Sequence, residues 1–306
     1  MQLTVVLVAE EGAGLRALQL LLDRGHRIAG VFTRSDHGSS VASVASRAKS
    51  HGVSVREASD VRCPATADWM RAQGVQLLLN VHSLDIVDPT VIEAPSLGAY
   101  NLHPGPLPER AGLHTPSWAI YEGADRYGVT LHRMTSEVDA GPIAFADRFA
   151  IREDDTGLSV MLQCVRRGLQ LIGQLLDVVE SGTAIPAHRQ DLALRRWYPA
   201  GPPEGGQVNW HDPARRIVDY VRACDYRPFR SPWGFPRCIT GALDVAIVKA
   251  SAVEGPVTAP AGTVAQAKGG AVVVAANDAW VRVDEVELDG HVVAAAEVLR
   301  DGSRLE

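Results

Sequence analysis

Three polar residues in the middle of the chain are of types that together can transfer an acyl group. Asn101 and His103 stand two positions apart at the end of an apolar, strand-like segment, and Asp139 follows 36 residues after His103. Side chains two positions apart on a strand point to the same face, so the amide and the imidazole would lie together. An amide donor suits a developing oxyanion, and a carboxylate can fix the tautomer or the charge of an imidazole. The combination favours acyl transfer from a neutral carrier to an amine.

Each of the three residues also has an ordinary structural interpretation. An Asn can end a strand by bonding to local backbone, an isolated His is usually a satisfied polar residue, and Asp is common in turns. The Pro-Gly-Pro-Leu-Pro turn directly after His103 favours the catalytic interpretation. His132, on a later strand-like segment, fits a supporting role better than a catalytic one. Contact between Asp139 and His103 is an expectation that only a structure can test.

The first part of the chain alternates between short β-branched segments and helical patterns. This alternation predicts an α/β fold, a Rossmann-like and mostly parallel sheet with helices on both faces, which binds ligands at the carboxyl ends of its strands. The predicted strands are 3–8, 28–32, 53–55, 75–81, 99–102, 127–134 and 143–151, and the predicted helices are 14–24, 39–51, 65–73, 113–123 and 155–181. Asn80 and the Asn101/His103 pair lie at such carboxyl ends. The Glu10–Gly14 segment lacks the full G-x-G-x-x-G pattern, which favours a tight turn over a dinucleotide site.

A Pro- and Gly-rich stretch separates two regions of different character. We predict a catalytic domain over residues 1–183, a linker over 184–206 and a smaller C-terminal domain over 207–306. In the last region a helical segment at 212–224 precedes short strand-like segments at 243–249, 262–265, 271–275 and 280–288. Turn residues between these segments indicate a small, OB-like β-barrel.

The composition is ordinary for a globular protein. The 306 residues carry 30 Lys and Arg against 36 Asp and Glu, a net charge of −6, which gives no electrostatic argument for a nucleic-acid partner. The four cysteines form no C-x-x-C pair and no His is spaced to complete a zinc site, so we expect buried, reduced thiols and no metal. We find no signal-peptide pattern and no apolar run that could span a membrane, and we expect a cytoplasmic protein.

Around these residues the chain resembles the folate-dependent formyltransferases, a family that includes methionyl-tRNA, glycinamide ribonucleotide and amino-sugar formyltransferases. The matching motif pieces are Asn101-Leu102-His103, Gly105-Pro106-Leu107-Pro108, Gly128-Val129-Thr130 and Asp139-Ala140-Gly141. The resemblance implies 10-formyltetrahydrofolate as formyl donor. It implies that Asn101 and His103 stabilise the formyl oxygen and that Asp139 orients His103 or a water that accepts the amine's proton.

The resemblance also implies a pterin site on two loops, in which backbone groups make most of the contacts. The matching residues are Ser83, Leu84, Ile86, Val138, Ala140 and Gly141. Leu84 and Ile86 could wall an apolar slot there, and packing inside the protein is an equally good interpretation of both.

The turn after His103 departs from the family pattern. Gly105 and Pro106 replace the usual Ser-Leu, and Arg110 stands one place before the usual Arg position. Because this turn lies beside the implied acceptor pocket, we predict that Pro106 and Arg110 contact the acceptor. The turn resembles that of formyltransferase modules in biosynthetic assembly lines. The resemblance therefore implies a small-molecule amine or hydroxylamine as acceptor, such as an amino sugar or a modified amino acid.

Three other functions stay open. A methionyl-tRNA formyltransferase acting on initiator tRNA would explain the C-terminal barrel and the Arg residues between 215 and 237, but the region Gly205–Glu306 has a net charge of −2, which disfavours a phosphate-binding surface. A 10-formyltetrahydrofolate hydrolase would use the same three residues with water in place of the amine. A non-catalytic folate-binding protein would not need all three. Exposed strands of the second domain also leave a homodimer open.

Overall fold

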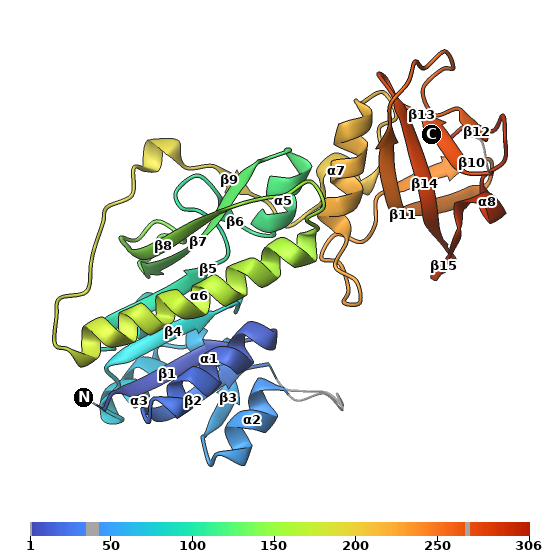
Figure 1. The fold of residues 1–306 in the computed structure, drawn as a ribbon. Helices are drawn as coiled ribbons and strands as arrows, with labels where there is room; N and C mark the ends of the chain where they lie inside the picture. The colour runs from blue at the N-terminus through green and yellow to red at the C-terminus, as the bar shows by residue number, and fades with distance from the viewer. Residues whose placement is uncertain (1, 35–42, 267–269) are drawn as a thin grey trace. The chain divides into compact units, whose positions relative to one another are not determined.

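The structure, a computed structural model, describes residues 2–34, 43–266 and 270–306, and its contacts divide the chain into two compact units (Figure 1). The first unit comprises Met1–Gly112, Gly128–Phe149 and Gln163–Trp197, and the second comprises Leu113–Tyr127, Ala150–Leu162 and Tyr198–Glu306. Two short segments that precede residue 183 thus belong to the second unit. Residues 184–197 of the predicted linker belong to the first unit, and its remaining residues belong to the second.

A seven-stranded sheet forms the centre of the first unit. Its strands are β1 (Thr4–Ala9), β2 (Arg27–Thr33), β3 (Val55–Glu57), β4 (Leu77–Val81), β5 (Gly98–His103), β7 (Arg126–Arg133) and β8 (Ile143–Ala150), in the order β3-β2-β1-β4-β5-β7-β8. The first five strands of this order pair in parallel, and β7 runs antiparallel to β5. Every residue of β4 is buried, as expected for a parallel strand with both faces covered. The predicted Rossmann-like sheet is therefore confirmed.

Helices cover both faces of this sheet (Figure 1). They are α1 (Glu11–Asp23), α2 (Val44–Ser50), the short helix η1 (Ala58–Arg62), α3 (Ala65–Ala72), α4 (Pro89–Ile92) and α6 (Gly157–Glu180). The first residues of the predicted helix 39–51 lie outside the described residues, and α2 begins after a capping box made by Ser43 and Ser46. Gly168 lets α6 approach the sheet, because a Cβ at this position would lie 2.6 Å from the Leu102 side chain. Leu102 therefore faces α6, while Asn101 and His103 face the opposite side of β5.

The second unit contains an antiparallel half-barrel sheet that follows α7 (Ala214–Cys224). Its strands are β10 (Arg237–Thr240), β11 (Leu243–Val253), β12 (Val264–Gln266), β13 (Val272–Ala275), β14 (Trp280–Leu288) and β15 (His291–Ala294), followed by α8 (Ala295–Val298). Alternate residues of β11, β13 and β14 form one apolar core with α7. The predicted C-terminal barrel domain is confirmed as an antiparallel half-barrel. Its strands β10 and β15 were not predicted. Of the helices in the described ranges, none is long and apolar enough to cross a membrane.

Of the remaining short elements, two lie between β5 and β7 in the sequence and three between α6 and α7. They are β6 (Ala111–Gly112), α5 (Thr115–Tyr121), the short helices η2 (Leu192–Leu194) and η3 (Pro203–Gly206), and β9 (Trp197–Tyr198).

Candidate active site

The Asn101 amide belongs to a row of polar side chains that crosses three neighbouring strands. Asn101 on β5 stands opposite Asn80 on β4 and His132 on β7. Asn80 Nδ2 donates a hydrogen bond to Asn101 Oδ1 at 3.1 Å and also lies 3.4 Å from Ser83 O. Since the Asn80 nitrogen faces two acceptors, the Asn101 oxygen accepts and the Asn101 nitrogen is left as a donor. A donor is the group that a developing oxyanion requires.

His132 fixes the other side of the Asn101 amide. Asn101 Nδ2 lies 3.1 Å from His132 Nε2, and His132 Nδ1 lies 3.0 Å from Arg133 O. A ring that carries its proton on Nδ1 satisfies both contacts, because it donates to the carbonyl and accepts from the amide. This arrangement agrees with the supporting role predicted for His132.

His103 and Asp139 face each other from β5 and from the loop after β7. The distance from His103 Nδ1 to Asp139 Oδ2 is 3.6 Å, and the two side chains are only 4% and 6% exposed. The other carboxylate oxygen lies 3.5 Å from His132 Nε2, and Gly112 N donates to Oδ2 at 3.0 Å. The structure therefore brings Asn101, His103 and Asp139 into one cluster, with His132 between the amide and the carboxylate.

The environment fixes the charge state of each of the two facing groups. Burial lowers the pKa of His103, although the Asp139 carboxylate opposes this effect. Burial alone would raise the pKa of Asp139, yet the positive charge that the His103 and His132 rings carry when protonated, together with the Gly112 N–H, holds it well below its usual range. A neutral imidazole therefore faces a carboxylate at neutral pH.

The proton of the neutral His103 ring can be placed from its second contact. His103 Nε2 lies 2.7 Å from Arg110 O, and a carbonyl oxygen can only accept. Nε2 therefore carries the proton, and Nδ1 presents its lone pair towards Asp139. An imidazole in this state can take up a proton at Nδ1, and the adjacent carboxylate stabilises the resulting cation.

The turn after His103 is held by the Gly-Val-Thr motif of β7. Thr130 Oγ1 donates to Gly105 O at 2.8 Å and accepts from Leu107 N at 3.1 Å. Gly128 has no room for a side chain, because a Cβ there would lie 2.7 Å from Asp147 O and 3.3 Å from Pro106 Cβ. Pro106 is thus buried against Gly128, and the turn reaches the site through its backbone.

The residues predicted to surround the pterin divide into two groups. Leu84, Ile86 and Val138 are 55%, 61% and 40% exposed, whereas Ser83 and Gly141 are buried and Ala140 is half-buried. The exposure of Leu84 and Ile86 contradicts the interpretation of these residues as core packing. It leaves two apolar side chains at the carboxyl end of β4, close in sequence to Asn80.

Two contacts of the site were missed at the sequence level. The Asn80–Asn101 hydrogen bond could have been predicted from the sequence, because both residues end adjacent parallel strands. No sequence pattern predicts the hydrogen bonds that Gln190 donates to the carbonyl oxygens of Asp139 and Gly141, because Gln190 lies in the stretch predicted as a linker.

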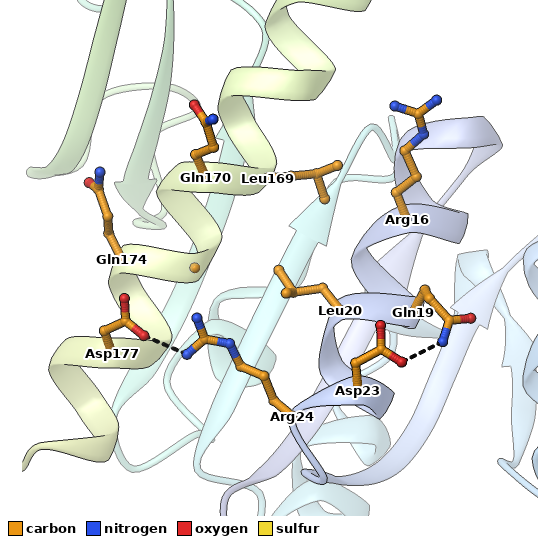
Figure 2. Close-up of a pocket in the computed structure, with 10 residues that line it drawn as sticks. Arg16, Gln19, Leu20, Asp23, Arg24, Leu169, Gln170, Gln174 and Asp177 are labelled. Atoms are coloured by element: carbon orange, nitrogen blue, oxygen red, sulfur yellow. Dashed lines mark hydrogen bonds and ion pairs between the residues drawn. The ribbon is translucent and has the colours of Figure 1, made fainter.

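A groove on the surface of the first unit contains none of the predicted site residues. It lies between α1 and α6, where Figure 2 shows Leu20, Gln170 and Gln174 around an ion pair between Arg24 and Asp177 at 2.6 Å. These side chains form no constellation with a recognisable reaction. Within the described ranges, no group of three or more His, Cys, Asp or Glu side chains could hold a metal ion.

Two family models match the chain over most of its length. The model of the formyl transferase domain matches residues 4–172, and that of the formyl transferase C-terminal domain matches residues 202–303. The chain belongs to the formyltransferase family. The resemblance drawn from the Asn101, Thr130 and Asp139 motifs is thereby confirmed.

Solved structures show the same fold as this formyltransferase. An N-formyltransferase from Helicobacter canadensis, in complex with folinic acid and dTDP-3-aminofucose, has a TM-score of 0.68 at 14% identity, over 92% of this chain and 99% of that chain. HypX from Aquifex aeolicus, in complex with tetrahydrofolic acid, has a TM-score of 0.66 at 19% identity, over 98% of this chain and 47% of that one. A sugar N-formyltransferase from Shewanella sp. has a TM-score of 0.60 at 18% identity, over 75% of this chain and 91% of that one. The formyltransferase described here thus spans about half the length of HypX.

Proposed function

We propose that this formyltransferase moves the formyl group of 10-formyltetrahydrofolate to the amine or hydroxylamine of a small-molecule acceptor. One observation carries the proposal. An amide donor, a neutral imidazole and a carboxylate stand in one connected cluster at Asn101, His103 and Asp139.

Asn101 would act on the formyl oxygen. When the acceptor nitrogen attacks the formyl carbon, the electrons of the carbon–oxygen double bond move to the oxygen, which becomes negative. The Asn101 amide nitrogen is fixed as a donor by Asn80 and His132, so it needs no reorientation as this charge develops. A preorganised donor of this kind is worth about 10²–10³ in rate.

His103 and Asp139 would move the proton. The attacking amine must lose one proton, and the lone pair of His103 Nδ1 can accept it. The cation so formed faces Asp139 at 3.6 Å. The same proton can then pass to the carrier nitrogen when its bond to the formyl carbon breaks, which yields tetrahydrofolate and the N-formyl product. In the neutral ring the Nε2–H is bound to Arg110 O and Nδ1 carries no hydrogen, so His103 suits proton transfer better than direct donation to the formyl oxygen.

The residues around Asn80 fit a folate donor. Leu84 and Ile86 offer exposed apolar surface. Asn80 Oδ1 and His82 Nε2 are buried polar atoms without a hydrogen-bond partner among the described residues. These two polar atoms and the two apolar side chains all lie between positions 80 and 86, and such a combination suits the flat, polar-edged ring of a pterin. Solved relatives in complex with tetrahydrofolic acid or folinic acid support the same donor.

Three Arg side chains of the second unit are engaged within the protein, which favours a small acceptor over transfer RNA. Arg215 and Arg222 both bind the buried Asp219 carboxylate, at 3.0 and 2.6 Å. Arg227 pairs with Asp225 at 2.8 Å and with Glu285 at 2.7 Å. Guanidinium groups held in this way are poor phosphate contacts, because leaving their carboxylates would cost free energy.

A panel of acceptors tests the proposal. The protein is incubated with 10-formyltetrahydrofolate and nucleotide-linked amino sugars, N-hydroxyornithine-type amines or charged initiator tRNA, and tetrahydrofolate release is followed by absorbance. Mass spectrometry then identifies the formylated acceptor. We expect turnover that depends on a small amine. Formate release without any acceptor would favour the hydrolase, and turnover with tRNA alone would reverse the choice of acceptor.

A further inference from the structure

Part of the segment predicted as a linker is bound to the first unit at both of its ends. His188 and Ile143 exchange two backbone hydrogen bonds, at 2.8 and 2.9 Å. Arg196 O accepts a hydrogen bond from Ala111 N at 2.9 Å. We call residues 188–196 the strap. Its ends are thus attached to the start of β8 and to the turn that follows Arg110.

Between these ends, two strap side chains bind the loop that carries Asp139. Gln190 Nε2 donates to Asp139 O at 3.0 Å and to Gly141 O at 2.6 Å. Arg195 Nη2 donates to Val138 O at 2.5 Å, and its Nη1 pairs with the Glu137 carboxylate. The two carbonyl acceptors also fix the orientation of the Gln190 amide, because its oxygen could bind neither of them.

The loop needs these external contacts because its own conformation is unfavourable. Asp139 has a φ of 56°, a left-handed conformation that costs a residue with a Cβ roughly 1 kcal/mol. Gly141 lies so close to β7 that a Cβ there would be 1.8 Å from Arg133 O. The Gly112 N–H that binds the Asp139 carboxylate follows Ala111, which is itself bound to the strap. The strap therefore holds both the backbone of the loop that carries the carboxylate and the segment that carries its backbone donor.

We propose that Gln190 is a positioning residue for Asp139. Gln190 touches no reacting atom. By holding the carbonyl groups on either side of Ala140, it sets the place of the Asp139 carboxylate between His103 and His132. The inference rests on the proposed function, in which His103 and Asp139 together handle the proton.

The test removes the donor and keeps the length of the side chain. Gln190→Met is compared with Gln174→Met, an exposed glutamine on α6 that Figure 2 shows in the groove. We expect Gln190→Met to lower kcat about 10²-fold, the size of effect that a misplacement of about 1 Å produces, with KM for both substrates changed less than about threefold. Gln174→Met should leave kcat and KM unchanged, and both variants should remain folded at the temperature of the assay.

A second readout does not depend on turnover. The charge of Asp139 raises the pKa of His103, so a displaced carboxylate should lower the pKa of His103 further. The titratable groups around His103 are Asp139, His132 and His82, and an NMR titration with assigned imidazole signals follows the His103 ring separately from the other two rings. Arg195→Lys, which keeps the charge but loses the planar fork that reaches Val138 O, should shift the pKa in the same direction with a loss of about tenfold in kcat.

The outcomes separate this inference from the proposed function. Wild-type kcat together with an unchanged His103 titration in Gln190→Met would overturn the positioning role. So would a loss of activity matched by an equal loss of folded protein. If the wild-type enzyme formylates no amine, but the variant still lowers the pKa of His103, the proposed function fails and the role of the strap stands.

Discussion

Replacing the Asp139 carboxylate by an amide tests the proton-handling pair most directly. In Asp139→Asn the oxygen can still accept from Gly112 N, but the negative charge 3.6 Å from His103 Nδ1 is gone. With an effective dielectric constant of about 20, a unit charge pair at this distance interacts by roughly 4–5 kcal/mol. The amide dipole keeps a part of this interaction. We therefore expect kcat to fall roughly 10³-fold, which corresponds to about 4 kcal/mol.

The pH dependence of the same variant gives the sign of the effect. His103 must be neutral to accept a proton, so activity should rise with pH through its pKa and then level off. Because Asp139 raises the pKa of His103, the rising limb should move to lower pH in Asp139→Asn even though the plateau drops. A loss caused by misfolding would leave the position of the limb unchanged.

The assay measures tetrahydrofolate release with saturating acceptor between pH 5 and 9, and it needs a matched control. Asp177→Asn makes the same exchange at a carboxylate on α6 that is 65% exposed and pairs with Arg24 (Figure 2). This control should retain full activity. A loss of less than about fivefold in Asp139→Asn would refute the idea that this carboxylate stabilises a cation on His103.

Three further perturbations have defined outcomes. Asn101→Ala should lower kcat by about 10²–10³ without moving the pH profile, because it removes a donor and no titrating group; a shifted profile would contradict this role. Gly141→Ala places a Cβ 1.8 Å from Arg133 O, so urea unfolding should show a loss of about 1–3 kcal/mol, whereas Gly173→Ala, whose nearest neighbour would be Arg24 Nη2 at 3.6 Å, should not destabilise the protein. Burial lowers the pKa of His82 from 6.5 to about 4, so the unfolded chain binds the proton more readily than the folded protein does. The free energy of unfolding should therefore decrease by about 3 kcal/mol as the pH falls from 6.5 to about 4. His82→Gln should flatten this part of the stability profile measured by urea unfolding, and an unchanged slope would contradict the assignment.

The sequence predicted the parts of the site that depend on local periodicity. Asn101 and His103 share a face because they lie two positions apart on β5, and the sheet order brings Asn80 beside them. The place of Asp139 could be expected only from the family motif. The loop that carries it follows no regular pattern, and its left-handed residue is not a glycine. Periodicity has no information about such a loop.

The strap shows why other parts could not be predicted. Gln190 and Arg195 bind backbone carbonyl groups, which every residue possesses, so no pairing of residue types in the sequence predicts the contact. The prolines and glycines around them favoured a linker. The missed strand β15 is a different case, since Asp289 and Gly290 form a two-residue turn with positive φ between paired strands. That dipeptide is a recognised hairpin signal.

The turn that departs from the family pattern can be interpreted from its contacts. Thr130 binds the backbone of Gly105 and Leu107. These hydrogen bonds to the backbone hold the turn even though Gly105-Pro106 replaces the usual Ser-Leu. Pro106 faces Gly128 inside the protein, whereas the carbonyl of Arg110 binds His103 and its side chain is only partly buried. A residue can select an acceptor only if its side chain reaches the substrate. We therefore expect Arg110, and not Pro106, to discriminate between acceptors, while any change that moves its backbone would also disturb His103.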